Sequence, residues 1–310
     1  MASKICSMQR LIVVYNPNSS QYVHVRDEVL TQLSRLEGVM VGKFTIKKTP
    51  FDDNLKELKK ILKSEDFVIA AGGDATAAVA ANAILESGKD ITFAALPYGN
   101  FNDLAHTLGT MRFEDIFEGA DSTQKLYPLD IIVDGEHWRY ATCYVTMGMT
   151  AEAVELFDEP KIRKKMQKGH RSSWRSYLQL AKWYFKNRHK KTFIPKFKLN
   201  GELHERRTSD YVAVNGRFVS RVMKGGDDYL NPKVFQSEVE KITSFPRLFM
   251  FMAKSIMSRV PGNKTNGDLI EFLEPATVEL QAEGEYKIFK NIHKIEIKKS
   301  EKYLRVIHKK

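Results

Sequence analysis

The chain has 310 residues, of which 43% are hydrophobic, and a formal net charge of +11 at pH 7. This length is enough for two domains of ordinary size, and no apolar run is long enough to cross a bilayer. The 2 cysteines are too few for a disulfide framework or a four-cysteine zinc site, so we expect any metal to be Mg²⁺ bound by oxygen.

Strands and helices are predicted to alternate over the first 110 residues. Apolar runs at 11–15, 39–46, 67–71 and 91–96 are typical of strands, and apolar residues at helical spacing follow the first two of these runs. The sequence from Thr49 to Asp52 has the pattern of a capping box, with Pro50 at the first helical position. Such alternation predicts a parallel sheet with helices on both faces, whose ligands bind beyond the carboxyl ends of the strands.

Two polar turns follow the third and fourth of these strands. The first turn contains Gly72 and Gly73, and the second contains Gly99. Glycine lets a backbone approach a ligand closely, and a helix predicted from residue 76 would point the positive end of its dipole at the first turn. These features predict a site for nucleotide phosphates. From spacing alone, an ordinary strand-to-helix turn explains the first turn equally well.

After residue 126 the pattern changes to adjacent strands with tight turns. Asp134-Gly135 separates runs at 129–133 and 137–146, and Asn200-Gly201 separates runs at 192–199 and 203–208, which predicts two hairpins. Strands return over 268–307, and the last strand, at about 300–310, is expected to return to the first sheet. We therefore predict an α/β protein, with a three-layer nucleotide-binding domain over 1–126 and a β-rich domain, a β-sandwich, over 127–299.

A basic stretch without acidic residues lies between Glu159 and Glu202. Within it, apolar and aromatic residues at 174–185 repeat at helical spacing, with lysine and arginine on the other faces. The segment 161–191 therefore predicts a basic amphipathic helix. Attraction to an anionic membrane and an ordinary solvated helix face explain this pattern equally well.

Four loop motifs occur in order along the chain, at residues 16–20 (Asn-Pro-Asn-Ser-Ser), 72–76 (Gly-Gly-Asp-Ala-Thr), 96–103 (Leu-Pro-Tyr-Gly-Asn-Phe-Asn-Asp) and 283–285 (Glu-Gly-Glu). Together they resemble the motifs of the diacylglycerol kinase and related lipid kinase superfamily, whose nucleotide domain is shared with NAD kinases. Each motif lies where the strand pattern predicts a loop. Their order favours the phosphate site over the ordinary turn.

The resemblance implies ATP and Mg²⁺ as cofactors and a diacylglycerol-like lipid as the phosphoryl acceptor. Glu283 takes the position of the catalytic base, Asp74 helps to position Mg²⁺, and Glu285 contacts the nucleotide or metal side. Asp227 and Asp228 are the candidates for a second, structural Mg²⁺ site. The residues implied to bind the nucleotide are Asn16, Pro17, Asn18, Ser19, Ser20, Thr49, Gly72, Gly73, Asp74, Ala75, Thr76, Gly99, Asn100, Asn102, Asp103 and Glu285.

Five residues depart from the family pattern. They are Ser20, Ala75, Val79, Asn100 and Phe101. At a positive φ, Ala75 would have a steric strain that glycine does not have, and Phe101 would crowd the phosphate channel. The alternative to a kinase is therefore a catalytically weakened or inactive homologue that binds nucleotide or lipid.

Several of these residues also fit structural roles. Thr49 fits a helix cap at least as well as a nucleotide contact, and Asn102 and Asp103 fit caps of a helix over 104–108. Without the resemblance, Glu283 and Glu285 would be solvated hairpin residues.

For the whole protein we expect a cytoplasmic location, because residues 1–10 lack the long apolar centre of a signal peptide. Peripheral contact with an anionic membrane would bring the protein to its lipid substrate. A homodimer is left open. Nucleic-acid binding is the weaker alternative for the positive charge, since a basic stretch does not explain the glycine-rich turns, and no nucleic acid is expected as a partner.

Overall fold

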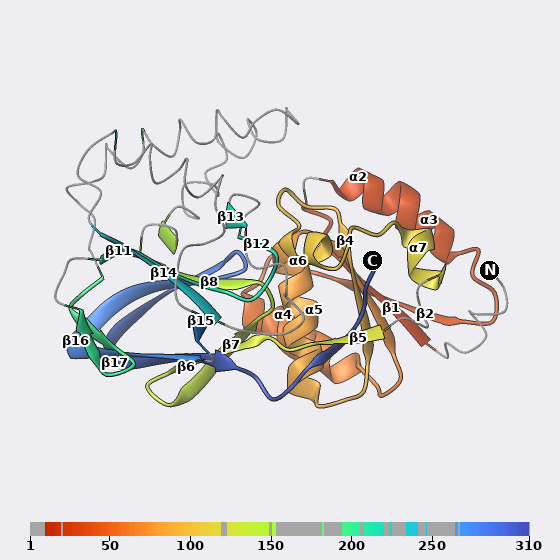
Figure 1. Cartoon of the computed structure of the whole chain (residues 1–310). Helices are drawn as coiled ribbons and strands as arrows, with labels where there is room; N and C mark the ends of the chain where they lie inside the picture. Colours follow the sequence, from red (N-terminus) through yellow and green to blue (C-terminus); the bar gives the residue numbers. More distant parts are fainter. Residues whose placement is uncertain are drawn as a thin grey trace.

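The computed structural model of the chain consists of two large sheets with helices packed around the first of them (Figure 1). It describes residues 10–19, 21–118, 123–148, 151–152, 182, 194–204, 208–219, 223–224, 234–240, 246, 264–265 and 267–309. Ser20, Asp227 and Asp228 lie outside the described residues, as does the basic segment 161–191 apart from Lys182.

The first sheet has six strands in the order β2-β1-β3-β4-β18-β5. Its strands are β1 (Arg10–Tyr15), β2 (Met40–Thr45), β3 (Phe67–Gly72), β4 (Thr92–Pro97), β5 (Thr123–Leu126) and β18 (Leu304–Ile307). The pairs β1–β2, β1–β3, β3–β4 and β4–β18 are parallel, and β5 is antiparallel to β18. The predicted parallel sheet is confirmed, and the loops after β1, β3 and β4 leave it at one edge.

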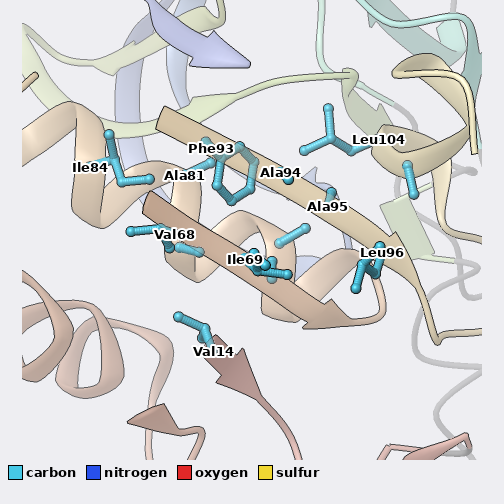
Figure 2. Close-up of a cluster of buried hydrophobic side chains, with 14 of the residues drawn as sticks. Val14, Val68, Ile69, Ala81, Ile84, Phe93, Ala94, Ala95, Leu96 and Leu104 are labelled. Atoms are coloured by element: carbon cyan, nitrogen blue, oxygen red, sulfur yellow. The ribbon is translucent and has the colours of Figure 1, made fainter. Parts of the chain in front are cut away.

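The helices of this part are α4 (Phe51–Ile61), α5 (Asp74–Ser87), α6 (Asp103–Thr107), α7 (Phe113–Glu118) and a continuous helical run made of α2 (Tyr22–His24), the π-helical stretch η1 (Val25–Leu30) and α3 (Thr31–Leu33). Figure 2 shows Ile69 of β3 and Phe93 of β4 in the core, with Ala81 and Ile84 of α5 nearby. Every residue from position 76 to 85 of α5 is buried. A helix that is apolar on all faces must be covered on all sides, and α5 contacts α4, β3 and a strand of the second sheet.

The second sheet is antiparallel and has ten strands, of which eight follow the order β15-β14-β11-β8-β16-β17-β6-β7 while β9 pairs with β10 and β16. The strands are β6 (Leu129–Val133), β7 (Glu136–Ala141), β8 (Tyr144–Gly148), β9 (Phe197–Leu199), β10 (Glu202–His204), β11 (Thr208–Val214), β14 (Val234–Glu240), β15 (Lys264–Thr265), β16 (Gly267–Ala282) and β17 (Glu285–Lys299). A short separate ladder joins β12 (Phe218–Val219) to β13 (Met223–Lys224).

Two hairpins of the second sheet, β6–β7 and β9–β10, are each closed by a tight turn of two residues. Asp134 and Gly135 have φ values of 49° and 91°, and Asn200 and Gly201 have values of 50° and 89°. Two successive positive φ values match the right-handed twist of the flanking strands, as in a type I′ turn. The two predicted hairpins are confirmed. The expected strand at 137–146 is wrong in one respect, because Thr142 and Cys143 interrupt it between β7 and β8.

The chain crosses between the two sheets twice. The first crossing joins β5 to β6, and the second joins β17 to β18. The rings of Tyr127 and Tyr303, one from each crossing, lie 5.7 Å apart, and the Lys125 ammonium lies 4.2 Å from the Tyr303 ring centre. The two crossings therefore lie side by side. The boundary between domains at 126/127 stays a prediction.

Helix α5 is joined to the second sheet by Asn82. Its amide nitrogen donates hydrogen bonds to the carbonyl oxygens of Ala78 and Tyr140, both at 2.9 Å, and its amide oxygen accepts one from the Tyr140 N–H at 2.9 Å. Strand β7 is the last strand of its sheet, so this amide satisfies backbone groups that a further strand would otherwise pair with. The Asn82 side chain is fully buried.

Changing Asn82 to alanine is expected to lower the free energy of unfolding by about 2 to 4 kcal/mol, because it leaves the N–H and C=O of Tyr140 buried without partners. Urea denaturation followed by circular dichroism measures this loss. Asn18→Ala, at an exposed asparagine, is the matched control and should change the value by less than about 0.5 kcal/mol. Equal stability of the two variants would contradict the role given to Asn82.

The predicted capping box at Thr49 is wrong. Helix α4 begins at Phe51 with Pro50 at the N-cap position, and no side chain caps it. Instead, the buried amide of Asn54 donates to the Thr49 hydroxyl at 3.1 Å and accepts from the Lys47 N–H at 2.8 Å. A buried asparagine in the second turn of the helix thus organises the residues that precede it.

Candidate active site

The turns after β3 and β4 touch each other through their backbones. A Cβ atom built on Gly99 would lie 2.2 Å from the Cα of Gly73, and one built on Gly73 would lie 3.1 Å from the Cα of Gly99. No real Cβ atom tolerates the shorter of these distances. Glycine at 99 is therefore required for the contact, and the two predicted phosphate turns form one continuous surface.

The carboxylate of Asp74 links these two turns. It accepts hydrogen bonds from the N–H groups of Asn102, at 2.9 Å, and Asp103, at 2.6 Å, which begin helix α6. A carboxylate at a helix N-terminus satisfies backbone donors and is favoured by the helix dipole. Asp74 thereby binds the loop that follows β4 to the start of α5.

Asn102 closes the second turn on itself. It has a φ of 57°, its amide oxygen accepts from the Gly99 N–H at 2.6 Å, and its amide nitrogen donates to the Gly99 carbonyl at 2.9 Å. Asn102 holds the N-cap position of α6, but its side chain makes no capping bond, so the expected capping role of this side chain is wrong. The Asp74 carboxylate instead accepts from the N–H groups of Asn102 and Asp103.

The loop that follows β1 is hydrogen-bonded to the turn that follows β4. Its own bend is closed by the Asn16 side-chain oxygen, which accepts from the Asn18 N–H at 2.9 Å. The Ser19 hydroxyl donates to the Tyr98 carbonyl at 3.4 Å, and the Gln21 amide donates to the Gly99 carbonyl at 2.9 Å. The structure thus brings together the loops after β1, β3 and β4. Gln21 was not singled out in the sequence, because its partner lies 78 residues away.

The N-terminus of α5 has the properties of an anion-binding site. The helix begins at Asp74 with Gly73 as N-cap, and no side chain caps it. The N–H groups in the first turn of any helix lack intrahelical acceptors, and here they follow the glycine turn. Thr76 packs over Gly72 so closely that a Cβ on Gly72 would lie 2.5 Å from the Thr76 hydroxyl oxygen. The geometry fits phosphate oxygens approaching along the helix axis.

The residues that depart from the family motifs have different environments. Ala75 lies within α5, is exposed and does not have a positive φ, so the strain expected there is absent. Val79 is buried within the same helix, and Asn100 is exposed. Phe101 is half-buried. The backbone of the first phosphate turn is therefore free of any penalty from the alanine.

Glu283 lies in the turn between β16 and β17, where it has a φ of 50° and Gly284 a φ of 91°. Its side chain is buried, with 4% of its surface exposed. One carboxylate oxygen accepts a hydrogen bond from the Thr142 hydroxyl at 2.5 Å and another from the Cys143 N–H. The interpretation of Glu283 as a solvated hairpin residue is therefore wrong.

The electrostatic environment of Glu283 suits a proton acceptor near neutral pH. Burial raises its pKa to about 7, the hydrogen bonds from Thr142 and Cys143 oppose this rise, and the negative charge of Asp74 adds to it. Because the Asp74 charge acts on Glu283, the turn between β16 and β17 lies within electrostatic range of the phosphate turns. Burial also raises the pKa of the Cys143 thiol, with Glu283, Asp103 and Asp74 contributing as nearby charges.

Burial of Glu283 predicts a pH dependence of stability. The pKa is about 7 in the folded chain and 4.5 ordinarily, so between these values the folded state binds a proton that the unfolded state releases. The free energy of unfolding should therefore fall as pH rises through this window, by about 2 to 3 kcal/mol between pH 5 and pH 7.5. Denaturant titrations of wild type and Glu283→Gln at a series of pH values measure this fall. The other titratable groups contribute equally to both proteins, so they cancel in the difference between the two curves. Parallel curves for the two proteins would contradict the raised pKa.

Arg139 of β7 connects Glu285 to helix α4. Its guanidinium lies 3.5 Å from a Glu285 carboxylate oxygen, 2.8 Å from a carboxylate oxygen of Asp52 and 3.6 Å from the ring centre of Phe51. The Arg139 side chain is only 6% exposed. This arginine was missed in the sequence, where a single basic residue between Trp138 and Tyr140 gives no signal. Glu285, expected to face nucleotide or metal, has an ion pair with Arg139.

The donor set fits a metal ion that arrives with phosphates. Within the described ranges there is no cluster of three or more histidine, cysteine, aspartate or glutamate side chains that would hold a metal by itself. Mg²⁺ commonly binds one or two carboxylates together with substrate phosphates and water. Asp74 lies beside the phosphate turns and fits this arrangement, whereas Asp227 and Asp228 lie outside the described residues. Among the described residues, no helix combines the length and the hydropathy that crossing a membrane requires.

Comparisons with known proteins point to one family. Residues 10–132 match the family model of the diacylglycerol kinase catalytic domain. A diacylglycerol kinase from Bacillus subtilis (strain 168) is 30% identical over 135 residues, which are 42% of this chain and 44% of that protein. The matched segment thus spans less than half the length of that relative. The first three loop motifs lie within residues 10–132, the range that matches the family model.

The solved structures extend the likeness to the second sheet. The crystal structure of a diacylglycerol kinase from Bacillus anthracis str. Sterne has a TM-score of 0.62 and 14% identity, over 97% of this chain and 97% of that chain. Two further structures from the same organism have TM-scores of 0.65 and 0.64 at 16% identity, each over 97% of this chain and over 95% and 97% of theirs. At these identities the likeness shows a shared fold, which includes both sheets.

Proposed function

We propose that this chain, whose residues 10–132 match the family model of the diacylglycerol kinase catalytic domain, is an ATP- and Mg²⁺-dependent lipid kinase. The acceptor in this proposal is a hydroxyl group of a diacylglycerol-like lipid. The observation that carries the proposal is the buried carboxylate of Glu283, whose pKa burial raises to about 7 and which lies close enough to Asp74 for that charge to add to the rise. A general base is most effective when its pKa lies near the operating pH.

The nucleotide would bind at the edge of the first sheet. The backbone N–H groups at residues 73–76 would hold phosphate oxygens, with Asn16 and Ser19 on the far side. Mg²⁺, when bound, supplies positive charge that neutralises the phosphates during transfer. Asp74, which accepts hydrogen bonds from Asn102 and Asp103 between the two phosphate turns, is the carboxylate that would position that ion.

Glu283 would accept the proton of the lipid hydroxyl as its oxygen forms a bond to the γ-phosphorus. The bond between this phosphorus and the bridging oxygen breaks in the same displacement, and ADP leaves with that oxygen. The proton then rests on the Glu283 carboxylate until it is lost to solvent. The bonds from Thr142 and Cys143 fix one carboxylate oxygen, so that the other can point at the acceptor.

A second candidate function is nucleotide or lipid binding without catalysis. The buried Val79 favours it, because the family pattern has a glutamate at this position and valine carries no charge. Retained ATP binding with no turnover in the assay below would establish this alternative.

The test is phosphoryl transfer from labelled ATP, with Mg²⁺, to vesicles that contain diacylglycerol. Glu283→Gln is the matched control, since it removes the base and keeps the size of the side chain. We expect labelled lipid from the wild type well above the variant. Equal labelling from both would overturn the proposal. Vesicles with and without anionic lipid test our further proposal that the protein acts peripherally at an anionic membrane surface from the cytoplasm, supported by the basic residues at 161–191.

A further inference from the structure

The turn that holds Glu283 is itself held from behind by Asn215. The carbonyl of Cys143 accepts hydrogen bonds from the N–H groups of Asn215, at 2.6 Å, and Gly216, at 2.7 Å. The Asn215 side-chain nitrogen donates to the Thr142 carbonyl at 2.7 Å. Thr142 and Cys143 thus face Glu283 with their donors and face Asn215 with their acceptors.

The close approach of these two segments depends on a glycine. A Cβ atom on Gly216 would lie 2.8 Å from the Cys143 sulfur and 2.9 Å from the Cys143 Cα. Asn215 has only 4% of its surface exposed, so its amide must find partners within the protein. Its nitrogen also donates to the Tyr127 carbonyl at 2.9 Å, in the first crossing between the sheets.

The orientation of the Asn215 amide is determined by Lys299. The Lys299 ammonium donates to the Asn215 side-chain oxygen at 2.6 Å. Lysine has only donors, and the carbonyls of Thr142 and Tyr127 have only acceptors, so the amide satisfies all three in one orientation alone. Without the lysine bond, the amide oxygen would lose its partner.

Lys299 is suited to hold this position. It ends β17, the strand that begins directly after the Glu283 turn. Burial lowers its pKa to about 7, and in the described part of the chain it forms no ion pair that would pull it elsewhere. Its neighbour Lys298 points the other way, is exposed and pairs with Glu296 at 3.0 Å. The two lysines therefore have different environments.

We infer that Lys299, acting through Asn215, is a positioning residue that holds the Thr142 and Cys143 donors against the Glu283 carboxylate. The effect of Lys299 on catalysis rests on the proposed function. Its effect on the position of the Thr142 and Cys143 donors rests on the hydrogen bonds alone. When the donors are misplaced, the ionised form of Glu283 loses stabilisation, so its pKa must rise.

Titration of Glu283 tests the positioning without any need for activity. The full chain is labelled with ¹³C at the glutamate carboxyl, and the Glu283 signal is assigned by its loss in Glu283→Gln. Lys299→Met keeps the apolar stem and removes the donor, and Lys298→Met is the matched control. We expect the titration midpoint of Glu283 to rise by about half a pH unit or more in Lys299→Met. It should equal the wild-type midpoint in Lys298→Met and lie close to it in Lys299→Arg.

The groups that act on Glu283 in this titration are Asp74, Cys143 and Thr142. Lys299→Met replaces none of these residues, so a shift of the midpoint reports a change in their position. Asn215→Ser removes the same bond from the other side and is used if Lys299→Met does not fold. A midpoint that is the same in wild type, Lys299→Met and Asn215→Ser would overturn the inference.

Kinetics add a readout that a purely structural role would not move. We expect kcat for lipid phosphorylation to fall about 10- to 100-fold in Lys299→Met with KM for ATP within about twofold, because only the base is misplaced. Loss of kcat and ATP affinity together would contradict positioning. If the wild type has no kinase activity, the proposed function fails, whereas the titration still decides the role of Lys299.

Discussion

Replacing Glu283 by glutamine is expected to lower kcat for lipid phosphorylation by about 10²- to 10⁴-fold, the range found when a general base is removed. The glutamine oxygen can still accept from Thr142 and Cys143, so the turn should keep its shape. ATP affinity should change by less than about twofold, since the nucleotide contacts lie on the first sheet. Initial rates with diacylglycerol vesicles, together with calorimetric ATP binding, measure both effects.

The pH dependence of the wild type gives the same prediction a second test. A base must be ionised to accept a proton, and burial sets the pKa of Glu283 at about 7. The rate should therefore rise about tenfold per pH unit below this value and level off above it. Any residual rate of Glu283→Gln should not rise with pH in this range. An acid limb that is present in both proteins would show that some other group is the base.

Glu283→Asp separates charge from position. The aspartate carboxylate is one methylene shorter and cannot reach both the Thr142 hydroxyl and the Cys143 N–H from the same backbone. We expect a rate between those of wild type and Glu283→Gln. A rate equal to that of wild type would mean that these two hydrogen bonds are unimportant for catalysis.

Changing Gly99 to alanine is expected to lower the free energy of unfolding by about 2 to 3 kcal/mol and to abolish ATP binding. The new Cβ would lie 2.2 Å from the Gly73 Cα and 2.8 Å from the Asn102 side-chain oxygen, so the two phosphate turns must separate. Overpacking of this kind typically costs about 1 to 3 kcal/mol. Denaturant titration and calorimetry with Mg²⁺-ATP measure the two losses.

Gly42→Ala is the matched control for this substitution. Its Cβ would meet the Ile12 side chain at 3.6 Å and the Leu11 carbonyl oxygen at 3.8 Å, which are ordinary contacts, and Gly42 lies on β2 away from the turns. We expect ATP affinity to be unchanged. If Gly99→Ala bound ATP as well as Gly42→Ala does, the contact between the turns would not be needed for nucleotide binding.

The parts of the fold that follow from local pattern were predictable. The uninterrupted apolar run at 67–71 became a fully buried parallel strand, and Asp134-Gly135 and Asn200-Gly201 became type I′ turns. In each case, the residues that determine the structure are neighbours in the sequence. The order of the loop motifs likewise predicted a resemblance to the diacylglycerol kinases, and residues 10–132 match the family model of their catalytic domain.

The side-chain contacts of the candidate site were less predictable, because their partners are distant in sequence. Glu283 meets Thr142 across 141 positions, and Asn82 meets Tyr140 across 58. Arg139 has partners on two separate elements, α4 and β17. A strand pattern shows which residues share a face, but it does not show which strand from elsewhere will face them.

The two errors in helix capping have a common cause. Both expectations assigned the cap to a residue adjacent to the helix, at Thr49 and at Asn102. In the structure, Asn54 organises the first turn from inside its helix, and Asp74 reaches α6 from the neighbouring loop. Capping patterns consider only the side chains next to a helix as partners for its free backbone groups. At both sites tertiary packing brought in a different side chain, Asn54 in one case and Asp74 in the other.

In the proposed kinase, the packing of α5 against the second sheet restricts how the protein can open to release its product. Asn82, which is bonded to β7, lies eight residues after Asp74, a distance of about 12 Å along the helix. Helix α5 thus has the phosphate turn at its N-terminus and the second sheet packed along its side. Any rotation that moved α5 away from the second sheet would have to break the Asn82 bonds to Tyr140. Exchange of nucleotide and lipid should therefore proceed by movement of loops, at a speed independent of any swing between the two sheets.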